Sequence, residues 1–110
     1  MALYEDKAMI IGATRSNQVE TLASSGWQES VSHLREIAAH TCISVHNGVL
    51  TIGGYLYDGP QMGNTKNVYL LREGQWSHVG ALIHPNNRGT SIHFGEFFLV
   101  FGGYAPNYVT

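Results

Sequence analysis

Short segments of alternating apolar and polar residues recur along this chain, and each one runs into a turn. The middle of the sequence predicts four strands, at 41–45, 49–52, 68–71 and 76–79. The first two are separated by the turn signal His46-Asn47-Gly48, and 72–75 turns the chain between the last two. The second strand ends at Gly53-Gly54. Four short antiparallel strands joined in this way describe one blade of a β-propeller.

The same features return with an offset of 49 residues. Gly53-Gly54 and Gly102-Gly103 lie 49 residues apart, and each diglycine closes an apolar segment and precedes a tyrosine. The other pairs with this offset are Val19 and Val68, Leu22 and Leu71, Trp27 and Trp76, Thr41 and Thr90, Ile43 and Ile92, and Tyr55 and Tyr104. A fixed period of this length indicates a repeat architecture.

The repeat divides the chain into three parts. Residues 1–31 predict an incomplete blade, residues 40–79 a full blade, and residues 89–110 the start of a third. The segment 31–38 has the pattern of a helical turn, but its position in the repeat favours a connection between blades. The sequence therefore predicts an all-β fold, a partial β-propeller of four-stranded antiparallel blades.

This pattern resembles the kelch repeat, in which the second strand ends in a diglycine and a tryptophan opens the fourth. The likeness covers nearly the whole chain, with departures. Gly12-Ala13 replaces a diglycine, leucines replace an aromatic residue late in the third strand (Leu22 and Leu71), and Ala39 stands one period before the family's arginine, Arg88. The resemblance implies a kelch-type propeller segment.

Glycines and tryptophans of the motif are predicted to be structural. A diglycine lets the backbone leave a strand with φ angles that other residues avoid, and it leaves room for a neighbouring blade. Each tryptophan can bury a large area against the next blade. This structural set comprises Gly53, Gly54, Gly102, Gly103, Trp27 and Trp76.

The chain holds about two blades, whereas propellers close a ring of four to eight. Each blade buries its faces against its neighbours, so two open faces would leave large apolar patches in water. We therefore expect a fragment of a larger propeller, with the remaining blades as partners; self-association that completes a ring is the alternative.

Long irregular connections are predicted to gather on one side of the blades, because the second-to-third and blade-to-blade connections leave the same end of the strands. Long loops on a rigid scaffold are where binding concentrates, and Tyr and Arg are enriched at hot spots. We expect a protein or peptide partner there. The candidate contacts are Tyr55, Tyr57, Asp58, Gln61, Asn64, His84, Asn86, Asn87, Arg88 and Tyr104.

Two alternatives stay open within this set. Arg88 either forks to a partner's carboxylate or braces adjacent loops through backbone carbonyls. The tyrosines that follow the diglycines, Tyr55 and Tyr104, favour packing over contact.

Composition and charge restrict the function further. The net charge is -2 with six basic residues, which argues against a nucleic-acid partner. Cys42 is the single cysteine, so an intrachain disulfide is excluded and a small buried side chain is expected. The amino-terminal residues lack the apolar core of a secretory signal, and no apolar segment is long enough to span a membrane. A cytoplasmic location and no membrane partner are expected.

The sequence carries no catalytic motif that would make the chain an enzyme. Its six histidines form no tight metal-binding pair, and elbow, P-loop and dinucleotide motifs are absent. We therefore expect no metal and no cofactor, and a protein-interaction module is the favoured function. The alternative is a fragment of a kelch-like copper radical oxidase, or of another propeller enzyme, whose ligands lie on other blades.

Overall fold

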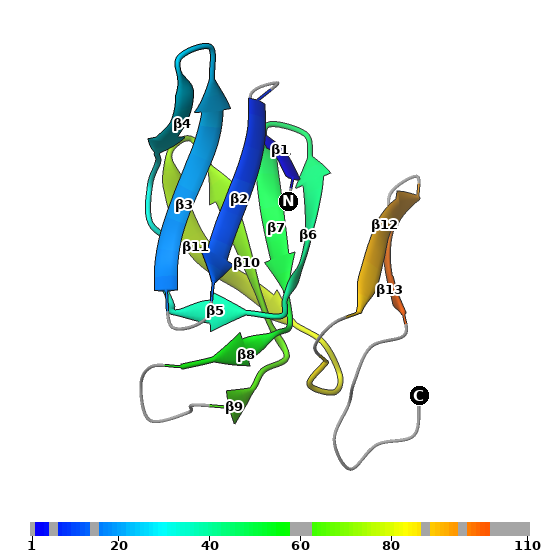
Figure 1. The fold of residues 1–110 in the computed structure, drawn as a ribbon. Coiled ribbons are helices and arrows are strands. Elements are labelled where there is room, and N and C mark those ends of the chain that lie inside the picture. The colour runs from blue at the N-terminus through cyan, green and yellow to red at the C-terminus, as the bar shows by residue number, and fades with distance from the viewer. Residues whose placement is uncertain are drawn as a thin grey trace.

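The computed structural model describes residues 2–4, 7–13, 16–57, 63–86, 89–94 and 97–101. Within these ranges every regular element is a β-strand, thirteen in all (Figure 1). No helix in the described ranges is long and apolar enough to cross a membrane.

The first blade is a four-stranded antiparallel sheet in the order β1-β2-β3-β4. Its strands are β1 (Ala2–Tyr4), β2 (Lys7–Ala13), β3 (Ser16–Ala23) and β4 (Gly26–Glu29). The sequence predicts an incomplete blade at 1–31 and does not predict β1, which pairs with β2 through only three residues. A three-residue strand is too short to show alternation in the sequence, so only its partner reveals it.

The second blade has the order β11-β10-β7-β6. Its strands are β6 (Thr41–Val45), β7 (Gly48–Ile52), β10 (Asn67–Arg72) and β11 (Gln75–Ala81). These strands match the four that the apolar pattern predicts. The next unit contributes the hairpin β12 (Thr90–Phe94) and β13 (Phe97–Phe101), a two-stranded sheet in the described residues.

Strand register repeats with the 49-residue offset. Thr41 pairs with Ile52 as Thr90 pairs with Phe101. Likewise the pair Leu22–Trp27 recurs as Leu71–Trp76. The second strand of the first blade departs from this offset. Ile11 faces Val19 as Ile52 faces Val68, but Ile11 is fewer than 49 residues before Ile52. The connection from the second to the third strand is therefore shorter in the first blade.

A small third layer covers one end of the blades. The segment 31–36 is an irregular connection and leads into β5 (Ile37–Ala38), which pairs with β8 (Tyr55–Leu56), and β8 pairs with β9 (Gly63–Asn64). Figure 1 shows this sheet at the end where β2 and β7 finish, below the two blades. The connection expected at 31–38 is thus confirmed, and it forms no helix.

The main core lies between the two blades. It joins the inward side chains of both sheets: Met9, Ile11 and Val19 from the first, and Val49, Tyr69, Leu71 and Trp76 from the second, with Tyr4 and Cys42 packed at its edge. A second cluster, Ile43, Leu50 and Ile52, lies on the opposite face of the second blade and packs with Val100 of β13. One face of the second blade is therefore covered by the first blade, and β13 covers part of the other.

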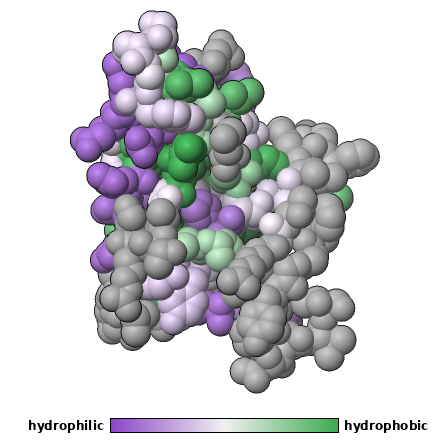
Figure 2. Space-filling model, in the orientation of Figure 1, coloured by the Kyte–Doolittle hydropathy of each residue, from purple (hydrophilic) through white to green (hydrophobic). Residues whose placement is uncertain are grey.

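The two tryptophans have different surroundings. Trp76 is 7% exposed, and its indole N–H donates to the carbonyl oxygen of Val31 (3.1 Å), so it packs against the preceding blade and not the next. Trp27 is 44% exposed. The expectation that both are buried was wrong for Trp27, because its face of the first blade has no neighbouring sheet among the described residues. Figure 2 shows hydrophobic patches on this side, among hydrophilic residues.

Candidate binding face

Both long connections of the second blade meet at the β5-β8-β9 end. The amide of Gly54 donates to the carbonyl of Asn86 (2.7 Å), and the amide of Thr65 donates to the carbonyl of Gly54 (2.9 Å). Asn86 returns a longer hydrogen bond to the carbonyl of Thr65 (3.4 Å), and Leu82 donates to Lys66 (2.7 Å). The described parts of these two connections, residues 53–57 with 63–66 and residues 82–86, are therefore joined by hydrogen bonds into one surface, which we call the loop platform.

The diglycine Gly53-Gly54 makes this close approach possible. The φ angles are 66° and 99°, in the left-handed region that side chains avoid. A Cβ on Gly53 would collide with the carbonyl oxygen of Asn86, and one on Gly54 would lie 2.7 Å from the carbonyl oxygen of Ala38. Both glycines thus occupy sites that only glycine fits without a shift. Gly102 and Gly103 lie outside the described residues.

Two tyrosines stand together on the platform. The rings of Tyr55 and Tyr57 are 4.9 Å apart between centroids, at 53°. Leu56 between them is 1% exposed and anchors the strand, while both tyrosines are half-buried. The amide of Tyr57 donates to the carbonyl of Glu36 (3.0 Å), which ties the segment to the connection between blades.

The other candidates fall into three groups. Asn64 is half-buried on β9, opposite Tyr55 in the sheet. His84 is exposed in the connection after β11, and Asn86 is half-buried, with its backbone holding the platform together. The remaining candidates lie outside the described residues: Asp58, Gln61, Asn87, Arg88 and Tyr104. The structure therefore brings Tyr55 and Asn64 to one small sheet, with Tyr57 directly after β8 and with His84 and Asn86 on the connection bound to it.

His40 sits beside the platform, and the sequence did not single it out as a site residue. A Cβ on Gly54 would lie 2.9 Å from the Cβ of His40. The Nδ1 atom of His40 is buried and has no hydrogen-bond partner among the described residues. Burial is the main reason that its pKa falls from the ordinary 6.5 to about 4. The imidazole is therefore neutral at pH 7.

Ala39, immediately before His40, has a φ angle of 56°. Left-handed backbone at a residue with a Cβ costs roughly 1–2 kcal/mol, so surrounding contacts hold this turn.

His33 was also missed, and it belongs to the core rather than to a site. It is 2% exposed and lies between the rings of Tyr69 and Trp76, at 4.8 and 4.5 Å between centroids. Its Nδ1 atom lies within hydrogen-bonding distance of the Arg35 backbone (amide nitrogen 3.0 Å, carbonyl oxygen 3.2 Å), and its Nε2 atom forms a hydrogen bond with the hydroxyl of Thr51 (2.9 Å). A histidine in a connection carries no sequence signal of such burial.

Metal-binding groups do not gather in the part of the chain that the structure describes: no three His, Cys, Asp or Glu side chains there are placed to hold an ion. Cys42 packs at the edge of the core between the blades, whereas Tyr55 and Tyr57 pair with each other on the loop platform.

Comparisons with known proteins give a structural likeness and no family. No protein-family model matches the chain. No curated protein matches it either. Among solved structures 82 chains match. One is the structure of YjhT, with a TM-score of 0.78 and 16% sequence identity over 96% of this chain.

This chain spans 38% of the length of the YjhT chain. At this identity the likeness shows the fold alone, which agrees with the sheets described above. The chain is all-β, and its four-stranded antiparallel blades form part of a β-propeller.

Proposed function

We propose that this chain is a protein-interaction module of the kelch type, and that its loop platform binds a peptide or protein partner. The observation that carries the proposal is the hydrogen bonding of Gly54, Thr65 and Asn86, which joins two long connections into one ordered surface. A surface that is ordered before binding loses less entropy when a partner docks.

The side chains of the platform suit a protein partner. Tyrosine supplies a large, rigid contact area together with a hydroxyl group, and it is enriched at binding hot spots. The rings of Tyr55 and Tyr57 contact each other at a tilt of 53°. Their backbone is held by β5 and by Glu36. Of the two, Tyr57 is the proposed contact, because Tyr55 follows the diglycine and favours packing.

The repeat supports the same side of the molecule. Asp58, Gln61, Asn87, Arg88 and Tyr104 fall in the same long connections or at repeat positions of them. The resemblance to kelch repeats supports a binding role as well, since the chain's diglycines, tryptophans and 49-residue period carry that pattern. The proposed partner is a polypeptide with aromatic and hydrogen-bonding side chains.

A random peptide library displayed on phage tests the proposal. The library is selected on the wild-type chain, and the peptides that emerge are measured by fluorescence anisotropy on three proteins: wild type, Tyr57→Ala and Glu73→Ala. We expect Tyr57→Ala to weaken binding by about tenfold or more, the loss of one hot-spot side chain.

Glu73→Ala is the matched control, because Glu73 is exposed in the tight turn between β10 and β11, at the opposite end of the blade. Peptides that lose affinity with Glu73→Ala but keep it with Tyr57→Ala would place binding at the other end and refute the proposal. Circular dichroism on each variant confirms that the strands remain.

A further inference from the structure

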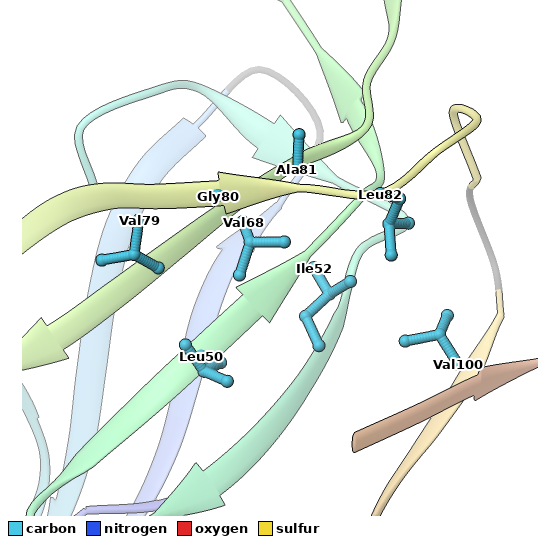
Figure 3. A pocket seen from close by; sticks show the side chains of 8 residues that line it. All are labelled: Leu50, Ile52, Val68, Val79, Gly80, Ala81, Leu82 and Val100. Atoms are coloured by element: carbon cyan, nitrogen blue, oxygen red, sulfur yellow. The ribbon is translucent and has the colours of Figure 1, made fainter. Parts of the chain in front are cut away.

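An apolar cavity of about 350 Å³ opens between the second blade and β13. Figure 3 shows its side chains converging from β7, β10 and β11 on one side, with Val100 of β13 on the other. The residues that matter here are Leu50, Ile52, Val68, Gly80, Leu82 and Val100. All of them are apolar or glycine, so the cavity has no charged group of its own to offer a ligand.

The walls of this cavity repeat the site that holds Trp76. In the first blade, Ile11 faces Val19 across the sheet, and both join Met9 and Trp76 in the core between the blades. In the second blade, Ile52 faces Val68 in the same register, and Leu50 occupies the position that corresponds to Met9. Three walls of the Trp76 site thus have counterparts in the cavity.

The backbone of the two sites also corresponds. The amide of His33 donates to the carbonyl of Asn17 (2.8 Å), and 49 residues later the amide of Leu82 donates to the carbonyl of Lys66 (2.7 Å). The equivalent hydrogen bonds indicate that Gly80 in the cavity corresponds to Val31 in the Trp76 site. The carbonyl oxygen of Val31 accepts the indole N–H of Trp76.

A sheet edge lies next to the cavity. The hairpin β12–β13 has the register of β6–β7, but β7 pairs with β10 on its other side, whereas no strand among the described residues pairs with the other side of β13. An unpaired edge beside an apolar cavity can accept a strand by β-augmentation.

We propose that the cavity receives a tryptophan carried on a partner β-hairpin, whose first strand pairs antiparallel with β13. The indole N–H would donate to the carbonyl oxygen of Gly80, as Trp76 does to Val31. An apolar cavity of about 150 Å³ already holds a benzene ring, so this larger cavity has room for an indole. This binding site is separate from the loop platform.

A second copy of this chain does not fit as the occupant. Its tryptophans lie on β4 and β11. The hairpins that carry them already pair with the second strand of their own blade, β2 or β7. Trp27 belongs to the hairpin β3–β4, which already pairs with β2. If this hairpin of another copy entered the cavity as β10–β11 of the second blade enters the Trp76 site, its β2 would occupy the place of β13. The occupant is therefore a two-stranded hairpin from outside residues 1–110.

The chain itself supplies the probe. A peptide with the sequence of residues 66–81 contains β10, its turn and β11, and so carries the pattern that fills the Trp76 site. The peptide is labelled with fluorescein and titrated with the whole 110-residue chain by fluorescence anisotropy. We expect saturable binding that weakens at least tenfold with Trp76→Ala in the peptide and changes little with Ser77→Ala.

Two variants of the protein locate the binding. Leu82→Glu places a carboxylate in the cavity and should abolish binding, whereas Ile83→Glu changes the neighbouring side chain, which is 87% exposed and outside the cavity, and should not. The peptide series needs no protein variant, so it decides the question even where Leu82→Glu unfolds the chain.

Three outcomes would overturn the proposal. The first is no binding by the folded chain, and the second is binding that is indifferent to tryptophan in the peptide. The third is a discrete oligomer of the chain alone, measured by light scattering, that Leu82→Glu dissociates; that result would make a second copy the occupant.

Discussion

Burial at a single position distinguishes two tryptophans that the repeat makes equivalent. Trp27 and Trp76 share a register, each opposite a leucine on the neighbouring strand. Trp76 is 7% exposed and hydrogen-bonded, whereas Trp27 is 44% exposed. The same residue at the same repeat position thus contributes differently to stability, because only one of the two faces another sheet.

The first prediction compares them. Trp76→Ala should lower the free energy of unfolding by about 3–5 kcal/mol, as large-to-small changes in a core do. Trp27→Ala should lower it by about 1 kcal/mol, because much of that side chain is already in water. Urea denaturation followed by circular dichroism measures both. Equal losses would contradict the core between the blades.

His40 carries the second prediction, which concerns pH. Burial lowers its pKa to about 4 in the folded chain, against 6.5 when unfolded. The unfolded state therefore binds a proton that the folded state refuses, and the free energy of unfolding should fall as pH drops from about 6.5 to 4. The loss is at most about 3 kcal/mol, from 1.36 kcal/mol per pKa unit.

His40→Gln is the control for this pH dependence, because glutamine does not titrate. The difference in unfolding free energy between wild type and His40→Gln should narrow or reverse on acidification between pH 6.5 and 4, as the wild type loses its advantage. A difference that stays constant over this range would show that His40 does not titrate as its burial requires.

Among elements, the connections carry more of the architecture than their irregular appearance suggests. The diglycine after β7 lets Gly54 and Thr65 meet Asn86 of the connection after β11. A three-stranded sheet forms from β5, in the connection between the blades, and from β8 and β9, in the connection after β7. The corresponding glycine of the first blade, Gly12, has a φ of 66° and lies against the carbonyl of Ile37. The strand ends therefore place the loop platform.

Gly53→Ala tests this role. The φ angle and the collision with Asn86 act together, so the free energy of unfolding should fall by at least about 2 kcal/mol. Gly74→Ala is the matched control: Gly74 has a φ of 76° but open space around it, and should cost about 1 kcal/mol. Similar losses in thermal unfolding would mean that conformation alone, and not the close approach, requires glycine.

At the scale of the whole molecule, one apolar face of the first blade stays open. Ile10, Leu22 and Trp27 are 39, 43 and 44% exposed on it. The second blade, by contrast, packs against the first blade on one face and against β13 on part of the other. Glu20 and Glu29 share this face, and exposed apolar side chains among polar ones are typical of a contact with another sheet or of a tendency to associate.

The fourth prediction concerns this face. The double variant Leu22→Lys and Trp27→Lys should reduce concentration-dependent association, measured by light scattering, because charge on an exposed sheet face opposes stacking. Its free energy of unfolding should stay within about 1–2 kcal/mol of the wild type. A change to Lys at Met9, which is fully buried, should instead unfold the chain. If the double variant associates as the wild type does, the prediction is wrong, and another surface is responsible for the association.

Local pattern sufficed for the strands of the second blade and for the hairpin after it. Period-two alternation, turn residues and the 49-residue offset are short-range properties, and the pairs Thr41–Ile52 and Thr90–Phe101 follow them. The sequence also predicts the left-handed backbone at Gly53 and Gly54, because this conformation strongly prefers glycine. Of the candidate contacts, the sequence grouped Tyr55, Tyr57 and Asn64 without showing that β8 and β9 pair.

Tertiary structure alone decided which equivalent residues are buried. The sequence by itself determined an all-β chain built from repeating blades, because alternation and turns act between neighbours along the chain. It could not separate Trp27 from Trp76, bury His33 between two rings, or open the cavity beside Val68. Nor could it show that Nδ1 of His40 is buried with no partner in the described part of the chain. Each of these depends on which sheet lies opposite, and that is settled by packing between segments far apart in sequence.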